Sequence, residues 1–347
     1  MKKTFFYNFI IFIFLFLCIE LFFGYWLEKN NFGFFIRNER LIEKNFEVIL
    51  NEKKYLVTYK RNYYGFRGEE VDPSKIKVIF EGGSTGNQKF LPENYTIVGQ
   101  LNSFLSNDKI NTKIYNASTD GKTIKGYIND FKSWFEKISD LKATYYIFYL
   151  GINDSNIFKP IWGYNSKFDI GTRSGIFEKT SDYIRNNSIT YELIIKIYNK
   201  YFSKYFIQNN PNHVYQDLYT NYNYIDYNKA KIIYNELELS KDEKYLLKYY
   251  KSQLGKLNSI INQYKIIPIF ITQIQYNGIG TKSLFLINEE TKKFAKSNNY
   301  YLIKLDEIIK NIEKNDFYDP FHNQISASKK IADAIYPEIK KIFNMKF

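Results

Sequence analysis

Five short apolar runs, separated by longer stretches with helical periodicity, constrain the fold of this 347-residue chain more than any other feature. The runs have the length of strands, and apolar residues recur at helical spacing in stretches such as 97–105 and 128–138. Strands that alternate with helices predict a parallel sheet covered on both faces. We therefore predict an α/β fold, a three-layer α/β/α sandwich with a five-stranded parallel sheet. Its strands are predicted at 77–81, 113–116, 144–150, 266–272 and 301–305.

An almost wholly apolar segment from Phe5 to Leu27 precedes this pattern. It is long enough for a helix to cross a hydrocarbon core of ~30 Å. A cleaved signal peptide needs a site of small residues after the apolar region, and residues 22–24 offer a poor one, so we favour an uncleaved signal anchor over residues 1–28. Glu20 inside the segment is protonated, reaches toward the interface, or faces a partner helix.

The charges around the anchor bear on its orientation. Lys2 and Lys3 predict a cytoplasmic N-terminus and a single-pass protein of the cytoplasmic membrane, with its main domain outside, in the periplasm or the extracellular space. Arg37, Arg40 and Lys44 on the far side oppose this orientation, because positive charge is normally retained inside.

The rest of the chain divides into three parts. Residues 29–74 form a connecting region, and residues 75–154 and 265–347 carry the predicted sheet. About 110 residues separate the third predicted strand from the fourth, and a structureless loop of that length is uncommon. We interpret 155–264 as an inserted, largely helical cap.

The net charge of +13 is spread along the chain, with lysines mixed among acidic residues, so we predict a basic surface rather than a nucleic-acid partner. The single cysteine, Cys18, lies in the apolar segment, which excludes an intramolecular disulfide and a cysteine-type zinc site. His213 and His322 are the only histidines. His213 has no acidic neighbour at ligand spacing and is interpreted as a surface residue.

The first predicted strand runs into Gly82-Gly83-Ser84-Thr85-Gly86, which matches G-x-S-x-G, an elbow that exposes a nucleophilic serine. A turn that needs glycine at positive φ would give the same pattern. The second strand leads into 116–123, a near match to a phosphate-binding loop ending in Gly121-Lys122-Thr123. Asn116 stands where that loop needs its first glycine, which weighs against nucleotide binding.

Two further turns carry polar residues. Asn153 follows the third strand and is either a donor to a developing oxyanion or an Asx-turn residue. Asp319 and His322, three residues apart around Pro320, can form a carboxylate–imidazole hydrogen bond that orients a general base. The alternative is a capping aspartate beside an exposed histidine.

Taken in chain order, these residues resemble the SGNH (GDSL-like) hydrolase family over roughly 77–342, apart from the insertion. By this resemblance the catalytic residues are Ser84, Asp319 and His322, and the oxyanion hole consists of the Ser84 N–H, the Gly121 N–H and the Asn153 amide. Gly83 departs from the Asp of the family name. The segment 62–68, Asn-Tyr-Tyr-Gly-Phe-Arg-Gly, also looks like one that precedes the catalytic block in membrane-anchored members.

The resemblance implies a hydrolase of ester bonds that works through an acyl-enzyme, without a metal or cofactor. Together with the anchor, it leads us to expect an acylated, chiefly O-acetylated, envelope glycan or lipid-linked substrate. Two alternatives stay open: an O-acyltransferase of the same fold that acts on a cell-envelope polysaccharide, and a non-catalytic glycan-binding protein.

Overall fold

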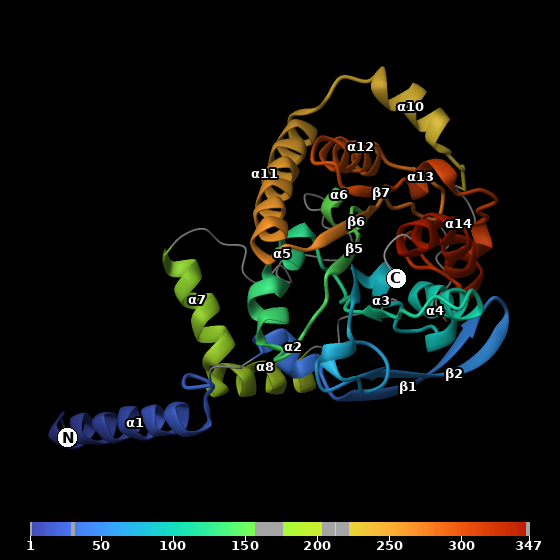
Figure 1. Ribbon diagram of the computed structural model, residues 1–347. Coiled ribbons are helices and arrows are strands. Elements are labelled where there is room, and N and C mark those ends of the chain that lie inside the picture. The colour runs from blue at the N-terminus through green and yellow to red at the C-terminus, as the bar shows by residue number, and fades with distance from the viewer. Residues whose placement is uncertain (1, 29–31, 157–175, 203–211, 213–221, 345–347) are drawn as a thin grey trace.

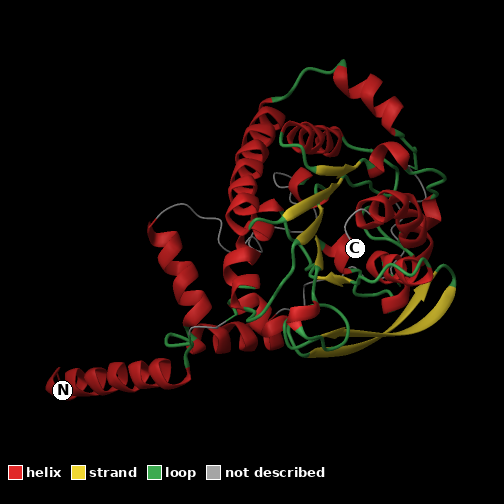
Figure 2. Ribbon diagram, viewed as in Figure 1, coloured by secondary structure: helices red, strands yellow, loops and turns green. Residues whose placement is uncertain are grey.

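A parallel sheet of five strands, in the order β4-β3-β5-β6-β7, lies at the centre of the molecule (Figures 1 and 2). The structure, a computed structural model, describes residues 2–28, 32–156, 176–202, 212 and 222–344. The predicted fold class and all five predicted strands are confirmed. The strands are β3 (Val78–Gly82), β4 (Ile114–Asn116), β5 (Tyr145–Tyr149), β6 (Ile267–Ile271) and β7 (Tyr301–Ile303).

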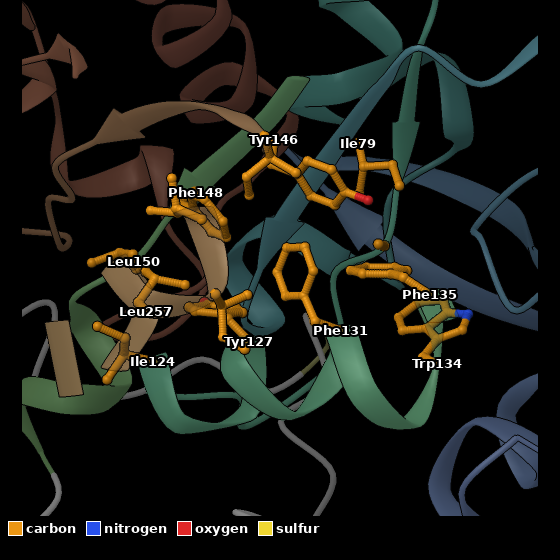
Figure 3. Packing of buried hydrophobic residues seen from close by; sticks show 14 of the residues in the cluster. Ile79, Ile124, Tyr127, Phe131, Trp134, Phe135, Tyr146, Phe148, Leu150 and Leu257 are labelled. Atoms are coloured by element: carbon orange, nitrogen blue, oxygen red, sulfur yellow. The ribbon is translucent and has the colours of Figure 1, made fainter. Parts of the chain in front are cut away.

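Helices cover both faces of this sheet (Figure 1). One face packs against α5 (Ile124–Ser133), α11 (Lys241–Tyr264) and α12 (Lys282–Ser297), and the other against α4 (Ile97–Asn107) and α14 (Ile325–Asn344). On the first face the aromatic rings of Tyr127 and Phe131 lie over those of Tyr146 and Phe148 (Figure 3). Because both faces are covered, the strands carry apolar residues without alternation.

The predicted cap is divided between two places in the structure. Its first helices, α7 (Ile176–Asn187) and α8 (Ile189–Phe202), contact α2 (Phe34–Glu39) and the N-terminal helix α1 (Lys2–Phe23), whereas α10 (Tyr227–Asn235) contacts α12. Its last helix, α11, belongs to the sandwich, since it is the crossover that leads into β6 and its apolar side enters the core. Residues 157–175 and 203–221, apart from 212, lie outside the described part of the chain.

The connecting region forms an antiparallel hairpin of β1 (Ile42–Leu50) and β2 (Lys53–Arg61). Asn51 and Glu52 both have positive φ, which is the type I′ pattern of two-residue hairpin turns. The inner face of the hairpin packs against the segment that follows the candidate nucleophile and against the loop of His322, through a buried cluster of Val48, Leu50, Val57, Phe90, Leu91 and Tyr318. The hairpin therefore braces two loops of the candidate site.

Helix α1 is long and apolar enough to cross a membrane over Lys3–Phe23, and most of its surface is exposed (Figure 1). A signal sequence would meet the same criteria. Glu20 is buried near its end, where its carboxylate accepts hydrogen bonds from Ser188 Oγ at 2.8 Å and Thr190 N at 3.0 Å. This carboxylate caps the N-terminus of α8. The structure therefore agrees with the interpretation in which Glu20 faces a partner helix.

The remaining short elements connect these parts. They are η1 (Pro73–Lys75), α3 (Ser84–Asn87), η2 (Glu93–Tyr95), η3 (Phe135–Lys137), α6 (Ile152–Ser155), α13 (Leu305–Ile308) and η7 (Lys314–Asp316).

Candidate active site

Ser84, His322 and Asp319 form a continuous chain of hydrogen bonds at one end of the sheet. Ser84 Oγ lies 2.7 Å from His322 Nε2, and His322 Nδ1 lies 2.6 Å from Asp319 Oδ2. Ser84 follows β3 at the point where the strand order reverses between β4 and β5. Ligands of open α/β sheets bind at such points, beyond the carboxyl ends of the strands.

Close packing, rather than positive φ, accounts for the glycines around Ser84. Neither Gly83 nor Gly86 has positive φ, so the turn interpretation based on backbone conformation is wrong. A Cβ on Gly83 would lie 2.4 Å from Asn153 Nδ2, and one on Gly86 would lie 2.6 Å from Ser118 Oγ. A side chain at position 83 would therefore displace the Asn153 amide.

Ser84 itself is the first residue of α3, with Gly83 as the N-cap residue. The first N–H groups of a helix have no partner within the helix. The Ser84 N–H can therefore donate to an anion outside the turn, next to its own hydroxyl.

The loop of His322 holds the imidazole in one tautomer. Asp319 Oδ1 accepts hydrogen bonds from the backbone N–H groups of Phe321 at 2.8 Å and His322 at 2.7 Å, which leaves Oδ2 for the ring. An ionised carboxylate can only accept, so Nδ1 carries the proton and the Nε2 lone pair faces Ser84. Ring stacking with Tyr318, at 5.6 Å between centroids, supports this orientation.

The two titratable groups shift each other's pKa in opposite directions. Burial lowers the pKa of His322, but the charge and hydrogen bond of Asp319, with the charge of Asp120, outweigh burial and raise the pKa above its ordinary value. Burial raises the pKa of Asp319, but the His322 charge and the hydrogen bonds it accepts lower it overall. Asp319 is therefore ionised at neutral pH.

Asn153 and Gly121 come together beside the serine. The hydrogen-bond pattern of β3 and β4 continues past the strands, since Thr119 N donates to Gly82 O at 3.1 Å. This brings the loop of Gly121, which has φ of +72°, alongside the serine turn. Asn153 Nδ2 donates to Lys122 O at 2.8 Å, and its second hydrogen remains for another acceptor. The structure thus gathers all five predicted site residues.

Lys122 turns inward and forms an ion pair with Asp130, with only 6% of its side chain exposed. The ammonium therefore cannot bind a phosphate as it would in a nucleotide-binding loop.

The buried carboxyl of Glu81 lies behind the same loop, and neither of its oxygens has a hydrogen-bond partner among the described residues. Burial, together with the charge of Asp130, raises the pKa of Glu81 well above its usual range.

Sequence reasoning missed a buried arginine behind Ser84. The Arg67 guanidinium donates to the backbone carbonyls of Asn87 and Gln88, the latter at 2.7 Å, and to Leu91 O at 2.6 Å. Its Nε pairs with Glu93 Oε2 at 2.6 Å. Arg67 thus caps the C-terminal end of α3, whose N-terminal residue is Ser84. The segment 62–68, singled out by resemblance alone, supplies it.

We expect Arg67→Ala to lower the free energy of unfolding by about 3–5 kcal/mol, because three carbonyls lose a shared buried donor. Urea denaturation measures this change. Lys60→Ala is the control, since Lys60 and Glu69 form an exposed ion pair and the unfolding midpoint should not move. Equal midpoints for the Arg67→Ala variant and the wild type would contradict the capping role.

Asp120 lies beside the candidate site and interacts with Asn87, Lys89 and His322. Its carboxylate accepts from Asn87 Nδ2 at 2.8 Å and lies 3.3 Å from Lys89 Nζ. Burial raises the pKa of Asp120, but the charge of Lys89, the Asn87 hydrogen bond and the charge of His322 outweigh burial and lower it. An ionised Asp120 in turn favours the protonated form of His322.

We expect Asp120→Asn to shift the acid limb of the kcat/KM profile to lower pH. An activity that uses His322 as a base would need the neutral ring and would be lost as pH falls through the raised pKa of His322. Removal of the Asp120 charge lowers that pKa. The variant should therefore keep a larger share of its maximal activity at pH 6. Asp333→Asn, which removes an exposed carboxylate on α14, should leave the profile unchanged. An unmoved or higher acid limb in Asp120→Asn would exclude this coupling.

His213 lies outside the described residues. Among the residues that the structure does describe, no three His, Cys, Asp or Glu side chains are grouped so as to hold a metal ion.

No protein-family model and no curated protein matches the chain. Among solved structures, the chain is similar to the psychrotrophic esterase EstA from Pseudoalteromonas sp. (12% identity, 77% of this chain and 98% of that one, TM-score 0.40). It is also similar to the acetyl xylan esterase AlAXEase (13%, 76% and 100%, 0.40) and to a lipolytic G-D-S-L family protein from Veillonella parvula (12%, 76% and 98%, 0.39). Similarity this low does not assign a family, so function has to be argued from the site.

Proposed function

We propose that this chain is a membrane-anchored serine esterase of the SGNH type, acting on acyl esters through a covalent acyl-enzyme. The observation that carries the proposal is the unbroken Asp319–His322–Ser84 chain, with both hydrogen bonds shorter than 2.8 Å, at the switch point of the sheet. A hydroxyl paired with an oriented, neutral imidazole is the requirement for a serine nucleophile.

The reaction proceeds in two halves. Ser84 Oγ attacks the acyl carbonyl while its proton passes to His322 Nε2, and the ester C–O bond breaks as that proton moves to the leaving alcohol oxygen. Water then attacks the acyl-serine, His322 takes its proton, and the carboxylic acid leaves as Ser84 regains a proton. Asp319 holds the imidazole and stabilises the imidazolium in both halves.

The oxyanion would be bound by the N–H groups of Ser84 and Gly121 and by the free amide hydrogen of Asn153. The remaining Asn153 amide hydrogen is fixed on Lys122 O, so the side chain is held for this task before substrate arrives. Loss of one such donor lowers kcat by about 10²–10³-fold in acyl-transfer enzymes.

We further propose that the anchor is retained and that the domain faces outward, toward O-acetylated envelope glycans or lipid-linked glycans. Helix α1 supports the anchor, since it is 21 residues long over its apolar part and mostly exposed. Full-length protein should sediment with membranes, and intact mass should include residues 1–28.

Acetate release from an O-acetylated polysaccharide tests this function. Wild type should release acetate and hydrolyse p-nitrophenyl acetate in water alone, and Ser84→Ala should do neither. Acetate transfer that occurs only with an added sugar hydroxyl would instead identify an acyltransferase. A folded wild type with no activity under either condition would indicate a binding protein.

A further inference from the structure

Gln273 joins two turns of the candidate site from a third strand. It lies two residues beyond the end of β6, with 2% of its surface exposed. Its Oε1 accepts from the backbone N–H of Ile152 at 2.7 Å, directly before Asn153. Its Nε2 donates to Thr85 Oγ1 at 3.0 Å, directly after Ser84. One side chain thus contacts the neighbours of both the nucleophile and the oxyanion donor.

The orientation of this amide is fixed by main-chain groups. The Ile152 N–H can only donate, so it requires the amide oxygen, and Tyr149 O can only accept, so it requires Nε2, which lies 3.4 Å away. Nε2 must then face Thr85 as a donor. A carboxylate of the same shape could not serve both sides.

Gln273 is itself held by a buried network. The backbone N–H of Gln273 donates to Asn288 Oδ1 at 3.3 Å, and Asn288 Nδ2 donates to the backbone carbonyl of Gln273 at 2.8 Å. Asn288 also donates to Asp306, which pairs with Lys292 at 2.8 Å and accepts from Thr272 Oγ1 at 2.7 Å. These contacts fix the backbone of Gln273, so its side chain reaches the two turns from a fixed point.

The place of this bridge matters because the β3–β5 ladder stops just before it. The last pair in the ladder is Gly82 with Tyr149, and the turns that follow carry Ser84 and Asn153. Gln273 links these turns immediately beyond that pair. We propose that Gln273 is a positioning residue that keeps the Asn153 amide aligned with Ser84 for oxyanion binding. This inference rests on the proposed esterase function.

A double-mutant cycle separates positioning from simple support of the fold. Gln273→Met removes the amide but keeps the length and approximate volume of the side chain. It should lower kcat by about 10–100-fold with KM little changed, since a small misplacement near the reacting centre costs about 10²-fold. In an Asn153→Ala background, the same change should lower kcat by less than about 3-fold, because the group that Gln273 positions is already absent.

Two controls and one substitute variant accompany the double-mutant cycle. Gln253→Met alters another buried glutamine, on α11, and should leave kcat unchanged. Thermal midpoints are compared for every variant. If Gln273→Met does not fold, Thr85→Val takes its place in the cycle, because it removes the hydrogen bond from Gln273 Nε2 while keeping the shape of the side chain. Thr85→Val should cause a smaller loss of kcat, and that loss should again disappear in the Asn153→Ala background.

Equal losses of kcat in the two backgrounds, or a loss confined to KM, would overturn the positioning role. Failure of the proposed function looks different, because wild type would then show no esterase activity that Ser84→Ala removes.

Discussion

Ser84→Ala is expected to lower kcat for p-nitrophenyl acetate by about 10⁴–10⁶-fold. The substitution removes the oxygen that is proposed to form the acyl-enzyme, and it leaves Asp319 and His322 in place. The half-buried Ser84 side chain contributes little to packing, so the thermal midpoint should stay close to that of the wild type. Steady-state kinetics at a known enzyme concentration measure the loss of kcat.

His322→Ala should cause a loss of similar size, and the double variant should be no worse than either single variant, because the two groups act as one unit. Ser103→Ala, at an exposed serine of α4, is the matched control and should have wild-type kcat. Additive losses in the double variant would mean that Ser84 and His322 do not act together.

Asp319→Asn is expected to lower kcat by about 10³–10⁴-fold through the tautomer of His322. The backbone N–H groups of Phe321 and His322 both point at Oδ1, so the amide oxygen of the asparagine must take that position. Its NH₂ group then faces Nδ1, which becomes an acceptor. The ring proton moves to Nε2 and points at Ser84, so Nε2 can no longer accept the serine proton.

KM should change little in this variant, and the fold should persist because the substitution preserves shape. The ring-proton resonances in an NMR spectrum report the tautomer directly: wild type should carry the proton on Nδ1, and Asp319→Asn on Nε2. Unaltered kcat in Asp319→Asn would show that Asp319 does not set the tautomer.

The sheet could be predicted because strands buried on both faces leave continuous apolar runs, as at β5. The hairpin of β1 and β2 was not predicted, although a signal exists. Phe46, Val48 and Leu50 lie at alternate positions, as do Tyr55, Val57 and Tyr59 across the turn. The residues between them are polar at Glu47 and Thr58 but apolar and exposed at Ile49 and Leu56, so the sequence shows only part of the period of two that is typical of a hairpin.

The cap boundary shows a different limit of sequence reasoning. The amphipathic pattern of α11 is equally suited to a cap and to a sandwich layer, since periodicity gives the apolar face but not its partner. The need for a crossover helix before β6 is the topological reason that places α11 in the sandwich.

The candidate nucleophile, histidine, aspartate, asparagine and glycine could be singled out because each stands at a strand end or within one short loop, and their roles were assigned by the resemblance. Gln273 could not, since its partners Thr85 and Ile152 lie 188 and 121 residues away in sequence and no local pattern marks it. Arg67 is similar, as its acceptors are main-chain carbonyls that any sequence would supply. Such supporting contacts follow from the fold rather than from a motif.

Reaction with a fluorophosphonate, followed by peptide mass mapping, tests the central claim most directly. Attack on phosphorus by an activated serine displaces fluoride and leaves a stable adduct, whatever the natural acyl group is. The account predicts one adduct on the peptide that contains Ser84 in wild type, much slower labelling in His322→Ala, and none in Ser84→Ala. An adduct on another residue, or labelling of Ser84→Ala at the wild-type rate, would contradict it.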